Sequence, residues 1–259
     1  MKIYLKKFHI ILLLLGIDLY KIYQSFRFFP KYVRGFFIFC RQSSSEKFGP
    51  LHFFPALSDS NASSGDVNSI YFLQDQIVAK MIFENGAKIH HDVGSRVDGF
   101  VLAVSCFAEV NIFDIRPLHS PIRSIKFVKH DFTLEPKNIK KVASLSCLHS
   151  IEHFGLGRYG DTLDYDGWKK GIDTLFEVLE HGGLLYLSVP IGRQRIEFNA
   201  HRIFDPEFFE SRLSQKGFKI VQRVFIDDLR HVVFLNTGLN DPDFWRQQNY
   251  GCGIWVLSK

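Results

Sequence analysis

Hydrophobic residues recur at helical spacing over 70–83, where Ile70, Leu73, Ile77 and Met81 fall on one face. The Asn85-Gly86 pair that follows is typical of a helix end. Beyond it the pattern changes to short runs of β-branched and aromatic residues, separated by amphipathic stretches. This alternation predicts a domain built from strands with helices between them.

The predicted domain spans residues 70–259. Its strands are expected at Lys88–Val93, Glu109–Phe113, Ser124–Val128, Lys141–Leu148, Leu184–Val189, Phe218–Ile226, His231–Leu235 and Gly253–Leu257. After Ile70–Phe83, helices are expected at Val97–Phe107, at Gly167–Glu180, and from Asp205-Pro206-Glu207 to near Gly217. The pattern predicts an α/β fold: a doubly wound, mostly parallel sheet with an antiparallel strand near the C-terminus.

Residues 1–42 form a predicted basic, partly apolar extension. Lys2, Lys6 and Lys7 precede the apolar run Phe8–Ile17, which is shorter than the roughly 20 residues that a membrane-spanning helix needs. The run fits the core of a secretory signal, but no small-x-small cleavage site follows it. Three interpretations remain: a basic amphipathic segment on a membrane surface, an uncleaved signal anchor, or an extension helix packed on the domain.

Residues 43–69 have the composition of a linker. Pro50, Pro55 and the polar run Ser58–Asn68 interrupt any regular pattern. Asn61-Ala62-Ser63 matches the acceptor pattern for N-glycosylation, which applies only to a segment that reaches a secretory lumen.

The composition excludes two classes of protein. Twenty-seven Phe and nine Tyr supply ample core material, so the chain as a whole is not disordered. Residues 1–41 carry a net charge of +7, and the remainder carries −2. The body therefore lacks the basic surface of a dedicated nucleic-acid binder. Four scattered cysteines form no Cys-x-x-Cys pair, which suits a reducing compartment, and the location expected is cytoplasmic or membrane-associated.

Acidic residues stand at the ends of the first three predicted strands. Asp92 ends the first, Asp114 ends the second and Asp131 follows the third. Because parallel strands end at one edge of a sheet, these carboxylates are expected to lie close together, where ligands bind. An acid like Asp114 can accept hydrogen bonds from both ribose hydroxyls of an adenosine. Each acid taken alone is also a common helix cap or loop residue.

The segment Lys88–Gly99 (KIHHDVGSRVDG) is a short strand, an acid, a glycine turn and a helix start. It resembles motif I of class I S-adenosylmethionine (SAM) dependent methyltransferases, in which glycine lets the backbone approach the cofactor. Ser95 and Arg96 stand where that family has further glycines. Leu179–Pro190 is similar to the turn and fifth strand of the type 11 methyltransferase group. The string GSRVDG…GLGRYGD…HRIFDP is similar to a nematode domain family of unknown function, number 268.

The resemblance implies a class I, Rossmann-like methyltransferase fold and SAM as cofactor, with an unidentified small-molecule, lipid or glycan acceptor. It places the cofactor against these residues: Asp92, Gly94, Ser95, Arg96, Gly99, Asp114, Ile115, Asp131, Phe132 and Leu148. Arg96 is a candidate partner for the carboxylate of the methionine part; the alternatives are that it points to solvent or holds Asp98. The expected acceptor residues are Arg158, Tyr159, Asp161 and His201.

Methyl transfer needs an aligned nucleophile and, for many acceptors, a base. His153 is the candidate base, because an unperturbed imidazole titrates near neutral pH. Glu152 is expected to orient it or to cap the following turn. Arg158, Tyr159 and Asp161 lie on a Gly-rich loop that is either a lid and substrate wall or a plain connection.

Two alternatives come from the same residues. His149-Ser150-Ile151-Glu152-His153 matches H-x-x-E-H, the inverted zinc-protease signature, which requires both imidazoles on one face of a helix. The glycines at 155 and 157 disfavour a long helix there, and the expected site contains no metal. The missing motif I glycines support the other alternative, a methyltransferase fold that binds a ligand without catalysis.

Overall fold

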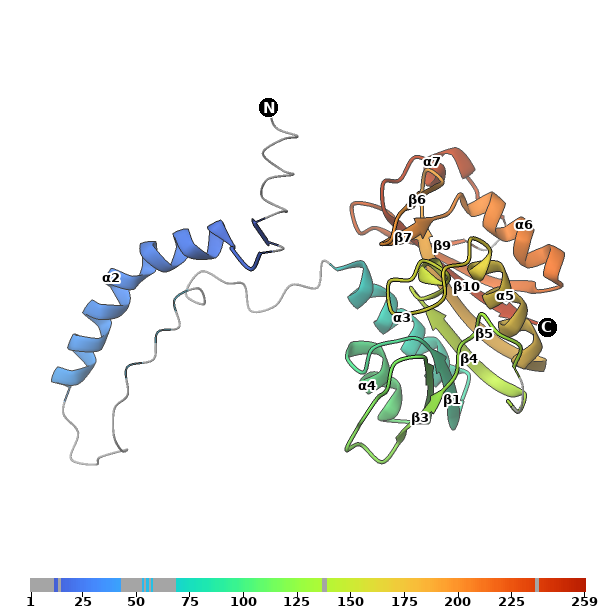
Figure 1. Ribbon diagram of the computed structural model, residues 1–259, viewed down its shortest axis with the longest axis horizontal. Helices are drawn as coiled ribbons and strands as arrows, with labels where there is room; N and C mark the ends of the chain where they lie inside the picture. Colours follow the sequence, from blue (N-terminus) through green and yellow to red (C-terminus); the bar gives the residue numbers. More distant parts are fainter. Residues whose placement is uncertain are drawn as a thin grey trace. The chain divides into compact units, whose positions relative to one another are not determined.

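The computed structural model describes residues 12–13, 15–42, 53, 55, 57, 69–136, 139–235 and 238–259 of the chain (Figure 1). The chain divides into two units, residues 1–66 and 67–259. Most of the predicted linker lies outside the described residues, as do Lys2, Lys6, Lys7, half of the run Phe8–Ile17 and the glycosylation pattern at Asn61.

The first unit contains helix α2, Leu19–Arg41. The carboxylate of Asp18 caps it by accepting hydrogen bonds from the backbone N–H groups of Tyr20 and Lys21. The helix buries none of its residues. Within the part of the chain that the structure describes, no helix has both the length and the apolar character to cross a bilayer.

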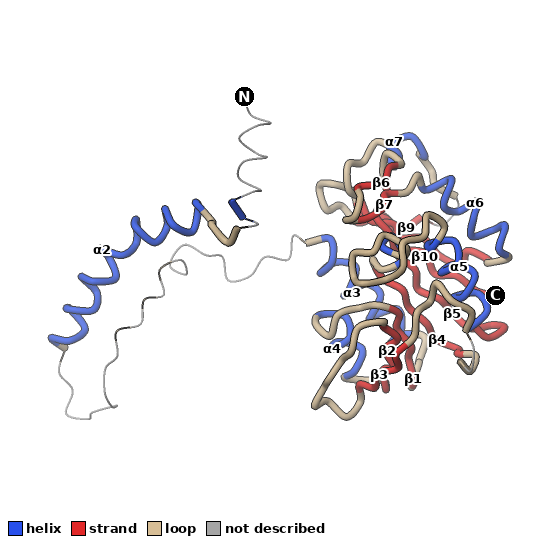
Figure 2. The backbone as a smooth tube through the Cα atoms, in the orientation of Figure 1, coloured by secondary structure: helices blue, strands red, loops and turns tan. Residues whose placement is uncertain are grey.

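The second unit is built on an eight-stranded sheet of order β3-β2-β1-β4-β5-β10-β8-β9 (Figure 2). Its strands are β1 (Ile89–Val93), β2 (Glu109–Asp114), β3 (Ile125–Lys129), β4 (Val142–Leu148), β5 (Leu179–Ile191), β8 (Lys219–Ile226), β9 (Val232–Leu235) and β10 (Gly251–Ser258). The pairs from β3 to β5 are parallel, and β10 lies antiparallel between β5 and β8. Six strands therefore share one direction, while β10 and β9 run against it, which confirms the predicted sheet.

Helices cover both faces of this sheet. Apolar residues of α3 (Ile70–Glu84) and α4 (Gly99–Ser105) join one core cluster. Residues of α5 (Gly167–Val178) and α6 (Pro206–Lys216) join the other. Successive residues of a strand enter opposite clusters, as the twofold period of a strand requires. In β10, Trp255 and Leu257 point to one layer and Ile254 and Val256 to the other.

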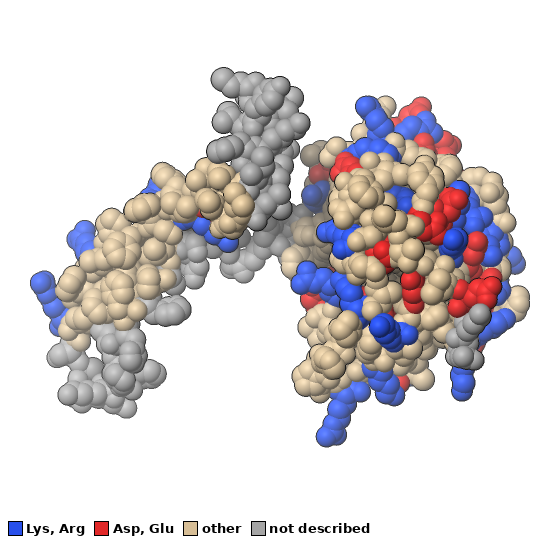
Figure 3. Space-filling model, in the orientation of Figure 1, with Lys and Arg blue, Asp and Glu red and all other residues tan. Residues whose placement is uncertain are grey.

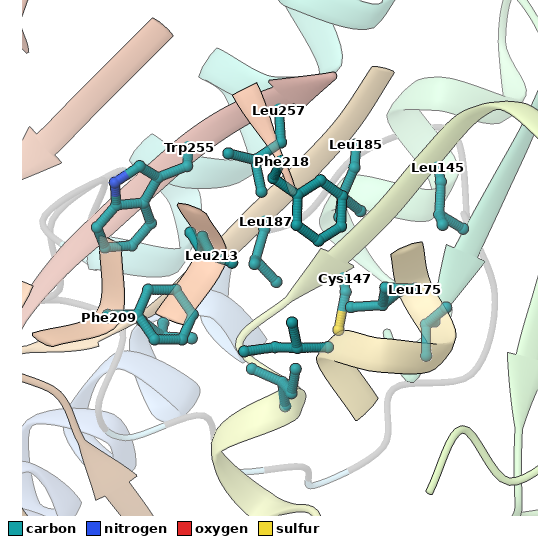
Figure 4. Close-up of a cluster of buried hydrophobic side chains, with 14 of the residues drawn as sticks. Leu145, Cys147, Leu175, Leu185, Leu187, Phe209, Leu213, Phe218, Trp255 and Leu257 are labelled. Carbon is teal, nitrogen blue, oxygen red and sulfur yellow. The ribbon is translucent and has the colours of Figure 1, made fainter. Parts of the chain in front are cut away.

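Phe209 and Leu213 of α6 show how tightly one layer packs (Figure 4). The ring of Phe209 lies 5.1 Å from that of Trp255, centroid to centroid. The sequence explains why α6 starts where it does. Asp205 accepts hydrogen bonds from the backbone N–H groups of Glu207 and Phe208, as predicted from the acid–proline start.

Several element ends differ from the sequence predictions. Helix α4 begins at Gly99 rather than Val97, because the residues before it form the turn after β1. Helix α5 stops at Val178, where Leu179 turns extended and pairs with Val142. The residues His181-Gly182-Gly183, expected to form a turn between the predicted helix and the strand Leu184–Val189, lie inside β5, where its pairing with β4 shifts register as a bulge.

Three short elements had no sequence prediction. They are β6 (Arg195–Glu197), β7 (His201–Ile203) and α7 (Pro242–Arg246). Strands β6 and β7 pair as a separate two-stranded sheet. Three residues are too few to show the twofold period of a strand, so the sequence pattern gave no signal for β6 or β7.

Candidate functional site

A cavity of about 580 Å³ opens where the parallel strands end. Gly94 follows β1, Asp114 ends β2, Asp131 follows β3 and His149 follows β4, and all four line it. This is the edge at which open α/β sheets bind ligands, and the volume is in the range of ligand pockets.

Most of the residues predicted for the site line this one cavity: Gly94, Ser95, Arg96, Asp114, Ile115, Asp131, Phe132, Leu148, His153, Arg158, Tyr159, Asp161 and His201. Asp92, Gly99 and Glu152 do not line it. Asp92 and Glu152 are buried beside it, and Gly99 starts α4, facing the carboxylate of Asp75.

Gly94 makes the turn after β1 in a conformation that few other residues adopt. Its φ is +80°, and a Cβ at this position would lie 2.1 Å from the Ser150 hydroxyl oxygen. The Gly94 N–H donates to the carbonyl of Phe113, which ties the turn to the end of β2. Both the positive φ and the lack of space for a Cβ therefore require glycine at position 94.

The side chain of Asp92 fixes this turn through hydrogen bonds. Its carboxylate accepts hydrogen bonds from the N–H and hydroxyl of Ser95, 3.0 Å each, and from the hydroxyl of Ser146 in β4. His90 continues the network, with its ring nitrogens 2.7 Å from the Ser144 hydroxyl and 2.9 Å from that of Ser146. Burial raises the pKa of Asp92 to about 6 and lowers that of His90 to about 3.

Replacing Asp92 by Asn is expected to change the stability of the full chain by an amount that depends on pH. The raised pKa means that the folded state favours the protonated acid, so wild-type stability falls as pH rises from about 4 to about 6. The shift corresponds to about 3 kcal/mol. The stability of D92N relative to wild type should therefore increase by about that amount between pH 4 and pH 7, measured by urea unfolding.

The effect of His90 on the pH dependence of stability cancels when D92N is compared with wild type. Its lowered pKa destabilises both proteins as pH falls, because the buried neutral ring must take up a proton on unfolding. The matched control is D98N, which changes an exposed carboxylate of the same turn and should alter stability by less than about 0.5 kcal/mol. A D92N difference that does not vary with pH would contradict the assignment of a buried charge to Asp92.

Asp114 is engaged by its neighbour Arg116. Its Oδ1 accepts from the backbone N–H and Nε of Arg116, and its Oδ2 accepts from Nη2 at 2.6 Å. A carboxylate offers about four lone-pair positions. Arg116 occupies three of these positions, so its contacts leave one position on Oδ2. The sequence predicted that Asp114 accepts from two hydroxyls of a ligand.

Asp131 also keeps part of its acceptor capacity. Its Oδ1 accepts from the N–H and hydroxyl of Thr133, at 2.8 and 2.7 Å. The described contacts leave Oδ2 without a partner. Phe132 is almost fully buried and packs its ring against Phe113, at 5.3 Å between centroids. The Nε2 of His130, which also lines the cavity, is buried without a hydrogen-bond partner.

Arg96 lies at the edge of the cavity. Its side chain is 82% exposed and pairs with Asp98 at 3.4 Å. Of the two partners considered from the sequence, the methionine carboxylate and Asp98, the structure shows the second. Nearby Asp75 of α3 lines the same cavity, and its burial raises the pKa of its carboxyl.

His153 is held by a backbone carbonyl. Its Nδ1 lies 2.7 Å from the oxygen of Ala200, and because a carbonyl only accepts, Nδ1 carries the proton. In the neutral ring Nε2 is then free to take a proton. Burial lowers the pKa of His153, which favours this neutral form. The residue that orients the His153 ring is thus Ala200. Glu152 lies 3.7 Å from Nε2, beyond hydrogen-bond distance.

Glu152 is bound to His149 instead, with 3.1 Å between its Oε1 and Nδ1 of the ring. Nε2 of His149 lies 3.4 Å from the Cys252 sulfur. Burial opposes charge on both groups. For His149, Cys252 and Glu152 outweigh it and raise the pKa; for Glu152, the hydrogen bond from His149 outweighs it and lowers the pKa. Both directions favour the charged forms of this buried pair, an imidazolium and a carboxylate.

The H-x-x-E-H segment does not form the helix that a zinc protease would need. Residues Ile151–His153 make a single 3₁₀ turn, and His149 precedes it with a φ of +44°. His149 also directs both ring nitrogens at protein atoms, Glu152 and Cys252. The two imidazoles thus do not share one face of a helix, so this alternative has no geometric support.

For the loop 154–166 the sequence left open a lid or a plain connection; we name it the lid loop, and its own residues organise it. The Asp161 carboxylate accepts from the backbone N–H groups of Gly155, Gly157 and Tyr159. Buried Arg202 donates to the carbonyls of Glu152, Phe154 and Tyr165, and so joins both ends of the loop to β7. Asp161 therefore shapes the loop, and its predicted contact with the methyl acceptor stays a prediction.

Tyr159 places an aromatic ring at the cavity wall. The guanidinium of Arg116 lies 4.4 Å from its centroid and that of Arg158 lies 5.2 Å away. The Tyr159 ring also meets His153 edge to face at 5.4 Å. Arg158 donates to the Ala200 carbonyl that holds His153, so lid loop and candidate base share one anchor.

A family model described as Caenorhabditis protein of unknown function, DUF268, matches residues 101–239, which is more than half of the sequence. The chain belongs to this family. The matched region of this DUF268 chain runs from α4 to beyond β9 and includes the lid loop. None of the curated proteins matches the sequence significantly.

Solved structures similar to this DUF268 chain share its architecture. The cyclase SpnF is 13% identical, with 76% of this chain and 85% of that chain covered and a TM-score of 0.52. The N-methyltransferase NodS from Bradyrhizobium japonicum, in complex with S-adenosyl-L-homocysteine, is 12% identical, with 75% and 89% covered and a TM-score of 0.51. The CurJ carbon methyltransferase is 13% identical, with 73% and 55% covered and a TM-score of 0.50. The fold is that of class I methyltransferases.

The cavity of the DUF268 chain also includes His149, which the sequence offered only as a zinc ligand, and residues that the sequence did not single out for a ligand site: Tyr71, Gln74, Asp75, Val93, Asp98, Phe100, Phe113, Arg116, His130, Thr133, Ser150, Phe154 and Tyr250. Tyr71 and Tyr250 come from opposite ends of the domain, and their hydroxyls lie 3.3 Å apart. Only the strand order brings them together, so no local motif could have indicated the pair. For Arg116, its position two residues after Asp114 was the available signal.

Proposed function

We propose that this protein is a SAM-dependent methyltransferase whose acceptor is a small molecule, a lipid or a glycan. The observation that carries the proposal is the single cavity that gathers Gly94, Asp114, Asp131 and His153 in a class I methyltransferase fold.

The residues present fit an adenosine cofactor in three respects. Gly94 offers backbone without a Cβ, where a Cβ would meet Ser150. Asp114 has one lone-pair position open to a ribose hydroxyl, and Asp131 has Oδ2 open to the adenine amino group. We propose that Gly94, Ser95, Asp114, Ile115, Asp131, Phe132 and Leu148 hold SAM, with Asp92 and Gly99 shaping the turn that they border.

When bound, SAM supplies a methyl group activated by its sulfonium. The protein must then orient the acceptor and remove its proton. His153 can take this proton at Nε2, because Nδ1 is committed to the carbonyl of Ala200. Glu152, 3.7 Å from Nε2, would stabilise the imidazolium that forms. His153 is therefore proposed as the catalytic base and Glu152 as its electrostatic support.

The acceptor is proposed to bind between the lid loop and β7. Arg158, Tyr159 and His201 line this part of the cavity. Arg158 has no carboxylate among its described contacts, so its guanidinium is available to a polar or anionic group of the acceptor.

The second candidate is a methyltransferase fold that binds a ligand without catalysis. The features that favour it are Ser95 and Arg96 in place of motif I glycines, with Arg96 directed to Asp98 at the surface. It differs from the first candidate in one measurable property, the release of S-adenosyl-L-homocysteine (SAH).

The test is incubation of the full chain with methyl-labelled SAM and fractionated small-molecule, lipid and glycan extracts. The proposal predicts label in one acceptor fraction together with an equal amount of SAH. Binding of SAM without label in any fraction would favour the binding protein. No binding of SAM at all would refute the methyltransferase and leave only a fold that binds another ligand without catalysis.

A further inference from the structure

Helix α2 has two faces of different chemistry. Ile22, Phe26, Phe29, Val33 and Phe36 recur every three or four residues and form one apolar stripe. Phe26 is 78% exposed, and no residue of the helix is buried. Among the described residues of this unit, none therefore forms a core that buries the stripe.

The basic residues follow a separate stripe. Arg27, Lys31, Arg34 and Arg41 also recur at helical spacing, and their mean direction lies about 135° around the axis from that of the apolar stripe. Lys21 brings the basic residues of α2 to five, and the helix contains no acid. Figure 3 shows basic side chains at the edges of a largely uncharged helix surface.

Aromatic residues enlarge the apolar stripe. Nine of the 23 residues of α2 are Phe or Tyr. Phe53, from beyond the helix, adds its ring to them, with centroids 6.4, 5.0 and 5.3 Å from Phe29, Tyr32 and Phe36. Phe53 is itself 53% exposed, so the cluster extends the apolar surface rather than closing it. Such rings are favoured at the boundary between lipid headgroups and acyl chains.

We propose that α2 lies in the plane of an anionic lipid bilayer, with its apolar stripe in the headgroup boundary and its long basic side chains extending back to acidic headgroups. Charge decides between this occupant and a second copy of the chain. A second copy of the helix would cover the apolar stripe but would add five more basic residues and no acid, whereas anionic headgroups neutralise the basic residues. The helix lies on the bilayer rather than crossing it.

The experiment is flotation of the full chain, without SAM, with vesicles of phosphatidylcholine alone or with about 30% phosphatidylserine. Binding to the anionic vesicles is expected to be at least tenfold tighter than to neutral ones and to weaken when salt rises to about 0.5 M. The triple variant R27E/K31E/R34E should lose at least tenfold of this affinity. The matched control K80E/K88E/K219E makes the same charge change on exposed lysines of residues 67–259 and should bind like wild type.

A second variant tests the apolar stripe. F26S/F29S should also lose at least tenfold, while F72S/F234S, which alters exposed Phe residues of the other unit, should not. Equal binding to both vesicle types would overturn the proposal. The proposal would also be overturned if a test variant and its control lost the same affinity for anionic vesicles. A dimer in lipid-free buffer that F26S/F29S abolishes would overturn it as well. None of these outcomes depends on whether the proposed methyltransferase activity exists.

Discussion

Replacing His153 by Asn is expected to lower kcat for methyl transfer by about 10²–10⁴-fold, the usual contribution of a general base. The Asn side-chain NH₂ can still donate to the Ala200 carbonyl, which now receives the Nδ1 proton of His153 at 2.7 Å. The variant thus keeps the anchor and loses only the atom that accepts the proton. Turnover is measured as SAH release, with the acceptor that the extract screen provides.

The pH profile separates catalysis from structure. Burial holds the pKa of His153 below the ordinary value of 6.5, so wild-type kcat should be flat above pH 6.5 and fall at lower pH. The variant H153N should lack this acid limb and bind SAH as wild type does. H231N is the matched control, since His231 pairs with Asp227 in the turn between β8 and β9. An unchanged kcat in H153N would remove His153 from the reaction.

Replacing Asp114 by Ala is expected to weaken SAH binding by more than tenfold. Hydrogen bonds to a buried charged group are worth about 1.5–3 kcal/mol, or roughly 10–150-fold in affinity. The carboxylate also holds Arg116 through three hydrogen bonds, so its loss frees this guanidinium beside the ribose position that we propose. Isothermal titration calorimetry of the full chain measures the change.

Two variants make the Asp114 result specific. D114N keeps one side-chain oxygen and should bind with intermediate affinity. E109A removes an acid from the first position of the same strand, where Glu109 pairs with Lys126 at the opposite end from the cavity, and should bind as wild type. Equal affinities of D114A and E109A, with both proteins folded by thermal melting, would exclude Asp114 from the site.

The fold follows from pattern because strand and helix periods are long-range regularities. The stop at Asn85-Gly86 and the acid–proline start at Asp205 mark helix ends through local hydrogen bonds, and both are found where predicted. The bulge in β5 could not be predicted, since it depends on Leu179 pairing with Val142 across the sheet. Periodicity is a property of one segment of the sequence, whereas a bulge depends on how two strands pair.

The same distinction applies to the site. Glycine at 94 and the acids at 114 and 131 sit at strand ends, so parallel topology alone brought them to one cavity. Asp92 also ends a strand, but its side chain turns beneath the loop toward Ser146. The partner of Glu152 is His149, and that of His153 is the distant Ala200 carbonyl. Which neighbour a side chain chooses depends on tertiary contacts that no motif contains.

Calorimetric titration of the full chain with SAH tests the central claim, that this cavity is shaped for an adenosine cofactor. The account predicts one saturable site per chain, which disappears or weakens more than tenfold in D114A. Absence of heat for SAH in the folded wild-type protein, or saturable binding that D114A and E109A share unchanged, would contradict it.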